Sequence, residues 1–172
     1  VLADTKPARS NAHHNIPGAY DGTQSIPVWV TEGGLKRPVD ENNLVSWENQ
    51  KDVAKAVVMK MLRYISQGTT KYFWFILGSY LESGNFGMFG EDKNVSPVYA
   101  AYSNMTYQLG EGKYKGTLSA LPEGGEGYMF ESFGKNIAVV WSDNAAIYKP
   151  KGKISYICDV MGNKVNLSKN GE

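Results

Sequence analysis

The sequence has little cysteine and histidine, no excess of charge of either sign and no long apolar run. Because Cys158 is the only cysteine, an internal disulfide and a site of clustered thiolates are both excluded. The longest apolar run, residues 72–77, is too short to cross a bilayer, so we expect no membrane span. A net charge of +1 gives no long-range attraction for nucleic acid or an acidic membrane.

The two histidines, His13 and His14, are neighbours in a polar N-terminal segment. No carboxylate or third histidine completes a ligand set at a useful spacing, so we expect neither a metal nor a cofactor. Residues 1–10 have neither a starting methionine nor the basic-then-apolar order of a signal peptide. Such a start is expected of an internal piece of a longer chain and equally of a mature secreted protein.

Aromatic residues and glycines are abundant, with 11 Tyr, 6 Phe, 4 Trp and 19 Gly. Aromatic-rich surfaces with little charge suit sugars and other neutral ligands, although core packing uses the same residues. The glycines indicate many turns.

Apolar and amphipathic segments alternate in the first 110 residues. Residues 26–31 and 71–77 are apolar on both faces, which predicts strands buried on both sides in a parallel sheet covered by helices. A helical pattern follows each strand, at 46–68 and at 96–110. The order strand, helix, strand, helix is typical of a parallel α/β fold.

Local signals mark the ends of both helices. Lys60 and Arg63 fall near the C-terminal end of the first, where the helix dipole favours basic side chains. The predicted boundary residues are Ser46 and Gly68 for the first helix, and Ser96, Pro97 and Gly110 for the second.

After Gly110 the pattern changes to short apolar runs separated by Gly, Asn and Asp turns, which predicts antiparallel β structure, part of a sandwich. We place a boundary near residue 111, giving domains of 1–110 and 111–172. Glu123 and Glu126 lie in a glycine-rich turn and are interpreted as a solvated linker, and Cys158 as a small buried hydrophobe in an apolar strand. The runs are residues 128–133, 136–142, 145–149, 153–160 and 164–168.

Glu32 is a carboxylate at the end of an apolar strand, followed by Gly33 and Gly34. In α/β barrels the carboxyl ends of the strands carry the catalytic groups. Retaining glycosidases need a carboxylate nucleophile there, with a second carboxyl group roughly 5 Å away. The two glycines would let the backbone turn sharply and leave the carboxylate approachable. The alternative is a solvated charge that opens a loop.

Three segments resemble the end of many retaining (β/α)8-barrel glycoside hydrolases, in the superfamily that includes families 5, 30 and 39. They are PVWVTEGG at 27–34, YFWFIL at 72–77 and FGMFGEDKNVSPVYAAYSNM at 86–105. The resemblance covers about residues 26–165. It implies the last two βα units of a TIM-type barrel followed by an incomplete antiparallel β-sandwich, and it favours a secreted or extracellular protein.

The same resemblance assigns roles to individual residues. It makes Glu32 the nucleophile, with a poly- or oligosaccharide as the substrate, and it places Trp74 near the sugar ring. Trp74 is equally well explained as a core residue of a buried strand. Tyr80 and Glu82 follow the second strand, and His14 precedes the first. Tyr80 and His14 are therefore further candidate substrate contacts, and the alternative for each of these residues is a loop residue without contact to the substrate.

The sequence departs from the family in two ways. The family's acid/base glutamate usually follows an asparagine, and no Asn-Glu dipeptide occurs here. A full barrel needs about 250 residues, more than precede the predicted sandwich. We therefore expect a C-terminal fragment that is inactive alone, with the N-terminal part of the barrel or another chain supplying the rest.

Two readings of a different class stay open. The chain is alternatively a non-catalytic carbohydrate-binding or adhesion module, in which case Glu32 is paired with a basic residue or exposed to solvent. It is alternatively a structural subunit whose strands pack against another polypeptide. Trp29 is expected in the core, because alternation directs it away from Glu32 and toward the helices.

Overall fold

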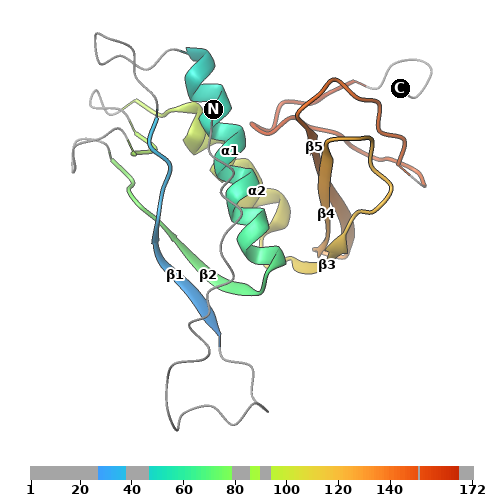
Figure 1. Cartoon of the computed structure of the whole chain (residues 1–172), viewed down its shortest axis with the longest axis horizontal. Helices are drawn as coiled ribbons and strands as arrows, with labels where there is room; N and C mark the ends of the chain where they lie inside the picture. Colours follow the sequence, from blue (N-terminus) through green and yellow to red (C-terminus); the bar gives the residue numbers. More distant parts are fainter. Residues whose placement is uncertain (1–26, 38–46, 79–85, 90–93, 151, 167–172) are drawn as a thin grey trace, which may run out of the picture.

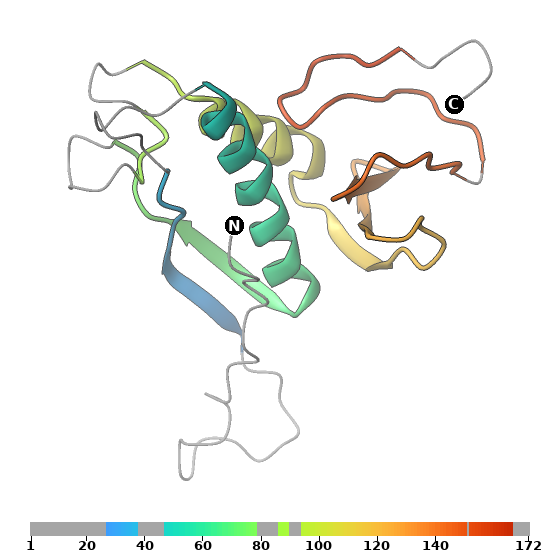
Figure 2. The ribbon, with the colours of Figure 1, turned by 45° about the horizontal axis from the view of Figure 1, so that its top comes forward.

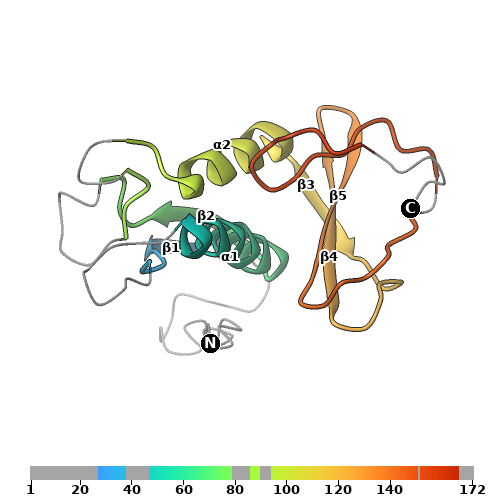
Figure 3. The same cartoon turned by 90° about the horizontal axis from the view of Figure 1, so that it is seen from above.

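The computed structural model of the chain describes residues 27–37, 47–78, 86–89, 94–150 and 152–166. This part of the chain is mixed α/β, with two helices, a two-stranded sheet and a three-stranded sheet. The helices lie side by side between the two sheets (Figure 1, Figure 3). Neither described helix is long and apolar enough to span a membrane.

The two-stranded sheet is the parallel unit that the sequence predicts. Strands β1 (Val28–Gly33) and β2 (Thr69–Trp74) pair in parallel, and helix α1 (Trp47–Ser66) connects them. Val30 lies opposite Tyr72, and the register shifts between Val30 and Gly33. That irregularity breaks strict alternation just before the strand ends.

Only one face of this sheet is covered by the described residues, so the prediction that both faces are buried is wrong. Tyr72 and Trp74 pack toward the helices, whereas Trp29 and Phe73 are 51% and 50% exposed. Both helices lie on the same side of β1 and β2 (Figure 2). Trp29 is therefore not a core residue. It contacts Phe73 instead, and the Lys71 ammonium lies over its ring, 4.3 Å from the centroid.

Helix α2 (Pro97–Leu109) begins and ends where the sequence predicts. Gly110 ends it with a positive φ of 44°. Ser96 occupies the N-cap position, but its hydroxyl makes no capping bond and donates to the Met88 carbonyl at 2.7 Å instead. The cap residue thus ties the helix to the preceding loop.

Both helices contribute to one apolar core that also includes two residues of the three-stranded sheet. Removing such side chains from water is the main stabilising term, about 1.5–3 kcal/mol for a fully buried Val or Leu. The core consists of Val53, Ala54, Val57, Val58, Met61, Leu62, Met88, Val98, Ala101, Met105, Leu109, Tyr128 and Phe130.

The second sheet is antiparallel, as predicted, with strands β3 (Lys113–Thr117), β4 (Gly125–Ser132) and β5 (Lys135–Ser142) in that order, although β3 lies outside the predicted runs. A two-residue turn joins β4 to β5, with Phe133 and Gly134 at φ of 49° and 70°. Such positive values match the right-handed twist of a hairpin.

The strands expected after β5 do not form in the described part of the chain. Residues 145–149, 153–160 and 164–166 contain one isolated bridge, between Cys158 and Lys164. Cys158 is half-buried and lies outside any regular strand, so the prediction of a buried strand residue is wrong. Apolar runs alone do not make a strand, which also needs a neighbouring strand to pair with; residues 158–162 instead contact Asn104 and Gln108 of α2.

An ion pair joins α1 to the second sheet. Arg63 Nε lies 3.0 and 3.1 Å from the two carboxylate oxygens of Glu126, and one terminal nitrogen of Arg63 donates at 2.5 Å. The Tyr128 hydroxyl also donates to Glu126, and the guanidinium lies over the Trp141 ring. Both charged side chains are about a quarter exposed. The interpretation of Glu126 as a solvated linker is therefore wrong, although Glu123 is exposed as expected.

Burial raises the pKa of Glu126, but the hydrogen bonds from Arg63 and Tyr128 and the Arg63 charge outweigh it, so the pKa lies below its ordinary value of 4.5. A carboxyl group with a lowered folded-state pKa adds stability above its unfolded pKa. That stability is lost as the pH falls through the folded value.

We expect Glu126→Gln to lower the free energy of unfolding at pH 7 by about 1.5–3 kcal/mol, the range for hydrogen bonds to charged groups. The difference from wild type should shrink as the pH falls below the unfolded-state pKa of a glutamate, about 4.3, and through the lower folded-state pKa, because the wild-type carboxylate then becomes protonated as well. Urea unfolding between pH 3 and 7 measures both effects. Glu131→Gln is the control, because the Glu131–Lys115 pair is half-exposed and should matter much less. Equal losses for the two variants would contradict the structural role of Glu126.

Asn104 of α2 holds the C-terminal segment. Its side-chain nitrogen donates to the carbonyls of Asp159 and Val160, both at 3.2 Å, and its oxygen accepts from Gln108. The Asp159 carboxylate in turn accepts three bonds within its own turn, from Met161 N, Asn163 N and the Asn163 side chain. One amide thus fixes a turn that is already internally hydrogen-bonded.

We expect Asn104→Ala to release this turn without unfolding the helices, because it removes two tertiary hydrogen bonds and no core contact. Amide hydrogen exchange of residues 156–163 should become roughly tenfold faster, with β4 and β5 unchanged. Ser103→Ala on the exposed side of the same helix is the matched control. Unchanged exchange at 156–163 would show that other contacts hold the segment.

Candidate functional site

Glu32 lies at the carboxyl end of β1, where its side chain is exposed. Its side chain makes no hydrogen bond or ion pair to another of the residues that the structure describes. A Cβ at the next position, Gly33, would meet Tyr72 and Val30, so position 33 is directed toward α1. Thr31 and Glu32, within the irregularity, are both exposed, so their exposure rather than strict alternation indicates that Glu32 is directed away from the helices.

Gly33 and Gly34 are required by close approach to β2 rather than by a sharp turn. Neither has a positive φ. The carbonyl of Gly33 accepts from Phe75 N at 2.9 Å, and a Cβ at this position would collide with the Tyr72 hydroxyl. At Gly34, a Cβ would collide with the backbone carbonyl oxygen of Phe75. The strand end that carries Glu32 therefore lies directly against β2.

Tyr72 fills the space beside Gly33. Its ring contacts Tyr64 of α1, with 5.4 Å between centroids. Its hydroxyl is buried and has no hydrogen-bond partner among the described residues. Burial, with a smaller contribution from Tyr64, raises the pKa of Tyr72 to about 12. The phenol is therefore neutral throughout the physiological range.

Lys60 is a residue of this region that the sequence did not reveal. Its ammonium donates to the Gly34 carbonyl at 2.9 Å, across from α1 to the loop after β1. Partial burial lowers the pKa of Lys60. The available signal was its position four residues, about one helical turn, before Tyr64, on the side of the helix that faces the strands. The helix dipole already explained a basic residue at position 60, so the sequence offered no reason to expect the bond to Gly34.

Trp74 lies opposite Gly33 in the parallel register, so the structure brings it next to the strand end of Glu32. It is half-buried, packs against the core, and its buried indole nitrogen has no partner among the described residues. A sugar contact for Trp74 stays a prediction. Trp74 also borders a cavity of about 270 Å³, whose other lining residues are Tyr72, Phe73, Leu77, Met88 and Tyr102.

The remaining candidates are not placed. Tyr80, Glu82, His13 and His14 lie outside the described residues, so their roles stay predictions. Within the described ranges, no three His, Cys, Asp or Glu side chains gather as a metal site.

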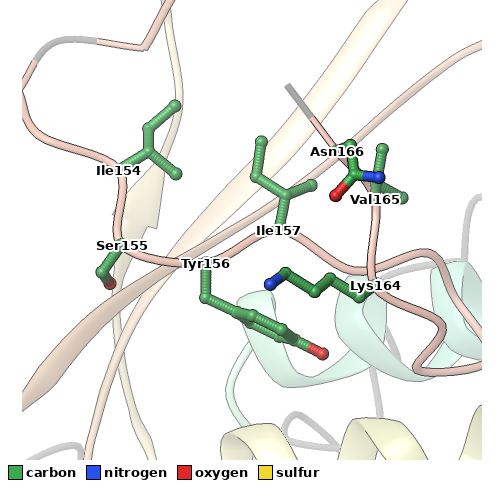
Figure 4. Close-up of a pocket in the computed structure, with 7 residues that line it drawn as sticks. All are labelled: Ile154, Ser155, Tyr156, Ile157, Lys164, Val165 and Asn166. Carbon is green, nitrogen blue, oxygen red and sulfur yellow. The ribbon is translucent and has the colours of Figure 1, made fainter. Parts of the chain in front are cut away.

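A second, smaller cavity of about 130 Å³ lies in the C-terminal segment (Figure 4). Tyr156, Ile157 and Lys164 line it, with Val165 N donating to the Ile157 carbonyl at 3.0 Å. It is remote in the fold from β1 and contains no carboxylate.

Comparison with known proteins gives a match in structure but none in sequence. No protein-family profile matches the chain, and no curated protein matches it by sequence. A solved family 39 glycoside hydrolase from the gut symbiont Bacteroides cellulosilyticus WH2 matches its structure with a TM-score of 0.68 and 19% identity. The match covers 88% of this chain and 32% of that one. The chain has a glycoside hydrolase-like fold. It spans about a third of the length of the matched enzyme.

We expect Gly34→Ala to destabilise the chain by about 1–3 kcal/mol, because the new methyl group meets backbone that has to shift. Thermal unfolding followed by circular dichroism measures the loss. Lys36→Ala, two residues further on and exposed, should leave stability unchanged. A neutral Gly34→Ala would mean that β1 and β2 do not approach as closely as described.

Proposed function

We propose that the chain is the nucleophile-bearing part of a retaining glycoside hydrolase. The observation that carries the proposal is the exposed carboxylate of Glu32 at the carboxyl end of a parallel strand, in a glycoside hydrolase-like fold. Glu32 would attack the anomeric carbon of a sugar and expel the leaving group. Water would then hydrolyse the glycosyl-enzyme ester.

This chemistry needs a second carboxyl group, roughly 5 Å from the first, that protonates the leaving oxygen and later activates water. In the family that the sequence resembles, this group follows a strand that has no counterpart among the residues that the structure describes. The proposal therefore includes a partner, in the form of the remaining strands of a TIM-type barrel. The exposed face of Trp29 and Phe73 supports it, because barrel strands bury that face against one another.

In this proposal, residues up to about 110 belong to the barrel, and those from 111 belong to a β-sandwich. The shared core of α1, α2 and β4 is compatible with such a junction, since Tyr128 and Phe130 pack against the helices. Arg63 and Glu126 would then be a contact between the two domains.

A non-catalytic carbohydrate-binding module is the second candidate, and the same exposed face favours it. Trp29 and Phe73 present aromatic surface beside Lys71, and aromatic faces pack well on the C–H side of a pyranose. In that case Trp29→Ala abolishes sugar binding and Glu32→Gln leaves it intact. If the site is catalytic, Glu32→Gln abolishes turnover and Trp29→Ala has the smaller effect.

The nucleophile is tested with a panel of 2-deoxy-2-fluoroglycosides that carry a 2,4-dinitrophenolate leaving group. Such compounds glycosylate the nucleophile and stay attached to it, so they trap the glycosyl-enzyme intermediate. The 172-residue chain alone is assayed beside the native protein, isolated from its source with an antibody against the chain. We expect a glycosyl adduct on Glu32 in the native protein, found by peptide mass spectrometry, and none on the chain alone. Glu32→Gln should abolish the adduct.

The intact mass of the native protein shows whether further polypeptide accompanies the chain. Asp52→Asn, an exposed carboxylate change on α1, is the control and should leave labelling unchanged. A native protein that is labelled on another carboxylate, or hydrolyses glycosides equally well with Glu32→Gln, would refute the assignment.

A further inference from the structure

The position of Glu32 depends on its backbone, because its side chain has no hydrogen bond or ion pair to other described residues. A nucleophile has to be held within a fraction of an ångström of its reacting atom, and a displacement of about 1 Å can cost a hundredfold in rate. The contacts of the two residues after Glu32 therefore decide how well it is positioned.

Besides the β1–β2 ladder, two hydrogen bonds from described residues hold this backbone. The first is the bond from Phe75 N to the Gly33 carbonyl, which continues the pairing of β1 with β2. The second is the bond from Lys60 to the Gly34 carbonyl, which comes from α1. The sheet bond fixes the strand end against β2, and the lysine bond fixes it against the helix layer.

A lysine is a costly choice at this place if stability alone is considered. Its side chain is partly buried, and an ammonium loses hydration there unless an acceptor replaces the water. An apolar side chain of similar length would pack between helix and strand without that cost. One turn further along α1, Tyr64 packs on Tyr72, whose hydroxyl lies beside Gly33. The turn 60–64 thus supports the backbone after Glu32 directly through Lys60 and indirectly through Tyr72.

We propose that Lys60 is a positioning residue for the nucleophile, holding the loop after Glu32 through the Gly34 carbonyl. This rests on the proposed function for its catalytic consequence, but the structural half is testable without any activity. The conservative variant Lys60→Arg keeps a cationic donor, whereas Lys60→Met keeps the length and loses the donor. Lys55→Met is the matched control, because Lys55 is on the same helix, exposed and paired with Asp52.

The first experiment measures amide hydrogen exchange in the 172-residue chain by NMR. In Lys60→Met the amides of residues 33–35 should exchange about fivefold faster, while β4 and β5 keep wild-type rates. Lys60→Arg should restore most of the protection, and Lys55→Met should show none of the loss. Wild-type exchange at 33–35 in Lys60→Met would overturn the proposal. If Lys60→Met does not fold, a Lys60→Arg protein with wild-type stability but fast exchange at 33–35 would overturn it too.

The second experiment uses the native protein, with the same variants introduced into its coding sequence, and measures inactivation by the fluoroglycoside that labels Glu32. A positioning role predicts that the maximal inactivation rate falls roughly tenfold or more in Lys60→Met, with the concentration dependence little changed, and recovers in Lys60→Arg. A purely structural role would lower the amount of labelled protein and leave that rate unchanged, which refutes positioning. If the wild type is not labelled on Glu32, the proposed function fails, and the exchange experiment still decides the contact of Lys60.

Discussion

One turn of helix α1 contacts both sheets, and the arrangement of the chain depends on it. Lys60 reaches the carbonyl of Gly34 after β1, Tyr64 packs on Tyr72 of β2, and Arg63 binds Glu126 of β4. The apolar side of the same helix forms most of the buried core with α2. Because these contacts share one turn of the helix, a shift in the position of α1 would move the end of β1 and the second sheet together.

The local patterns of the sequence were sufficient for β1, β2, both helices, β4 and β5, but not for β3 or for the region after β5. Runs of apolar residues gave β1 and β2, the 3.6-residue periodicity gave α1, and Ser96, Pro97 and Gly110 bounded α2 within one residue. These signals depend on neighbours within a few positions, so they survive without knowledge of the tertiary structure. The hairpin of β4 and β5 belongs to the same class.

Predictions that required a partner failed or stayed open. The burial of Trp29 depends on a layer over the second face of the sheet, which the described residues do not supply. Glu126 looked solvated because its neighbours in sequence are glycines, yet its binding partner is 63 residues away. Lys60 was explained by the helix dipole, and its bond to Gly34 follows from how α1 crosses β1. No local pattern contains that crossing.

The exposure of Glu32 and the exposure of Trp29 and Phe73 have one origin, which is the arrangement of both helices on the same side of β1 and β2. A layer over the other face would bury the aromatic pair and surround the carboxylate in the same step. Surrounding it with apolar walls alone would favour the protonated acid, which is a poor nucleophile. A productive partner therefore has to bring polar groups and a proton donor to Glu32 as well as apolar contacts to Trp29. The face can be covered by many sheets, but only a partner with both features completes a glycosidase site.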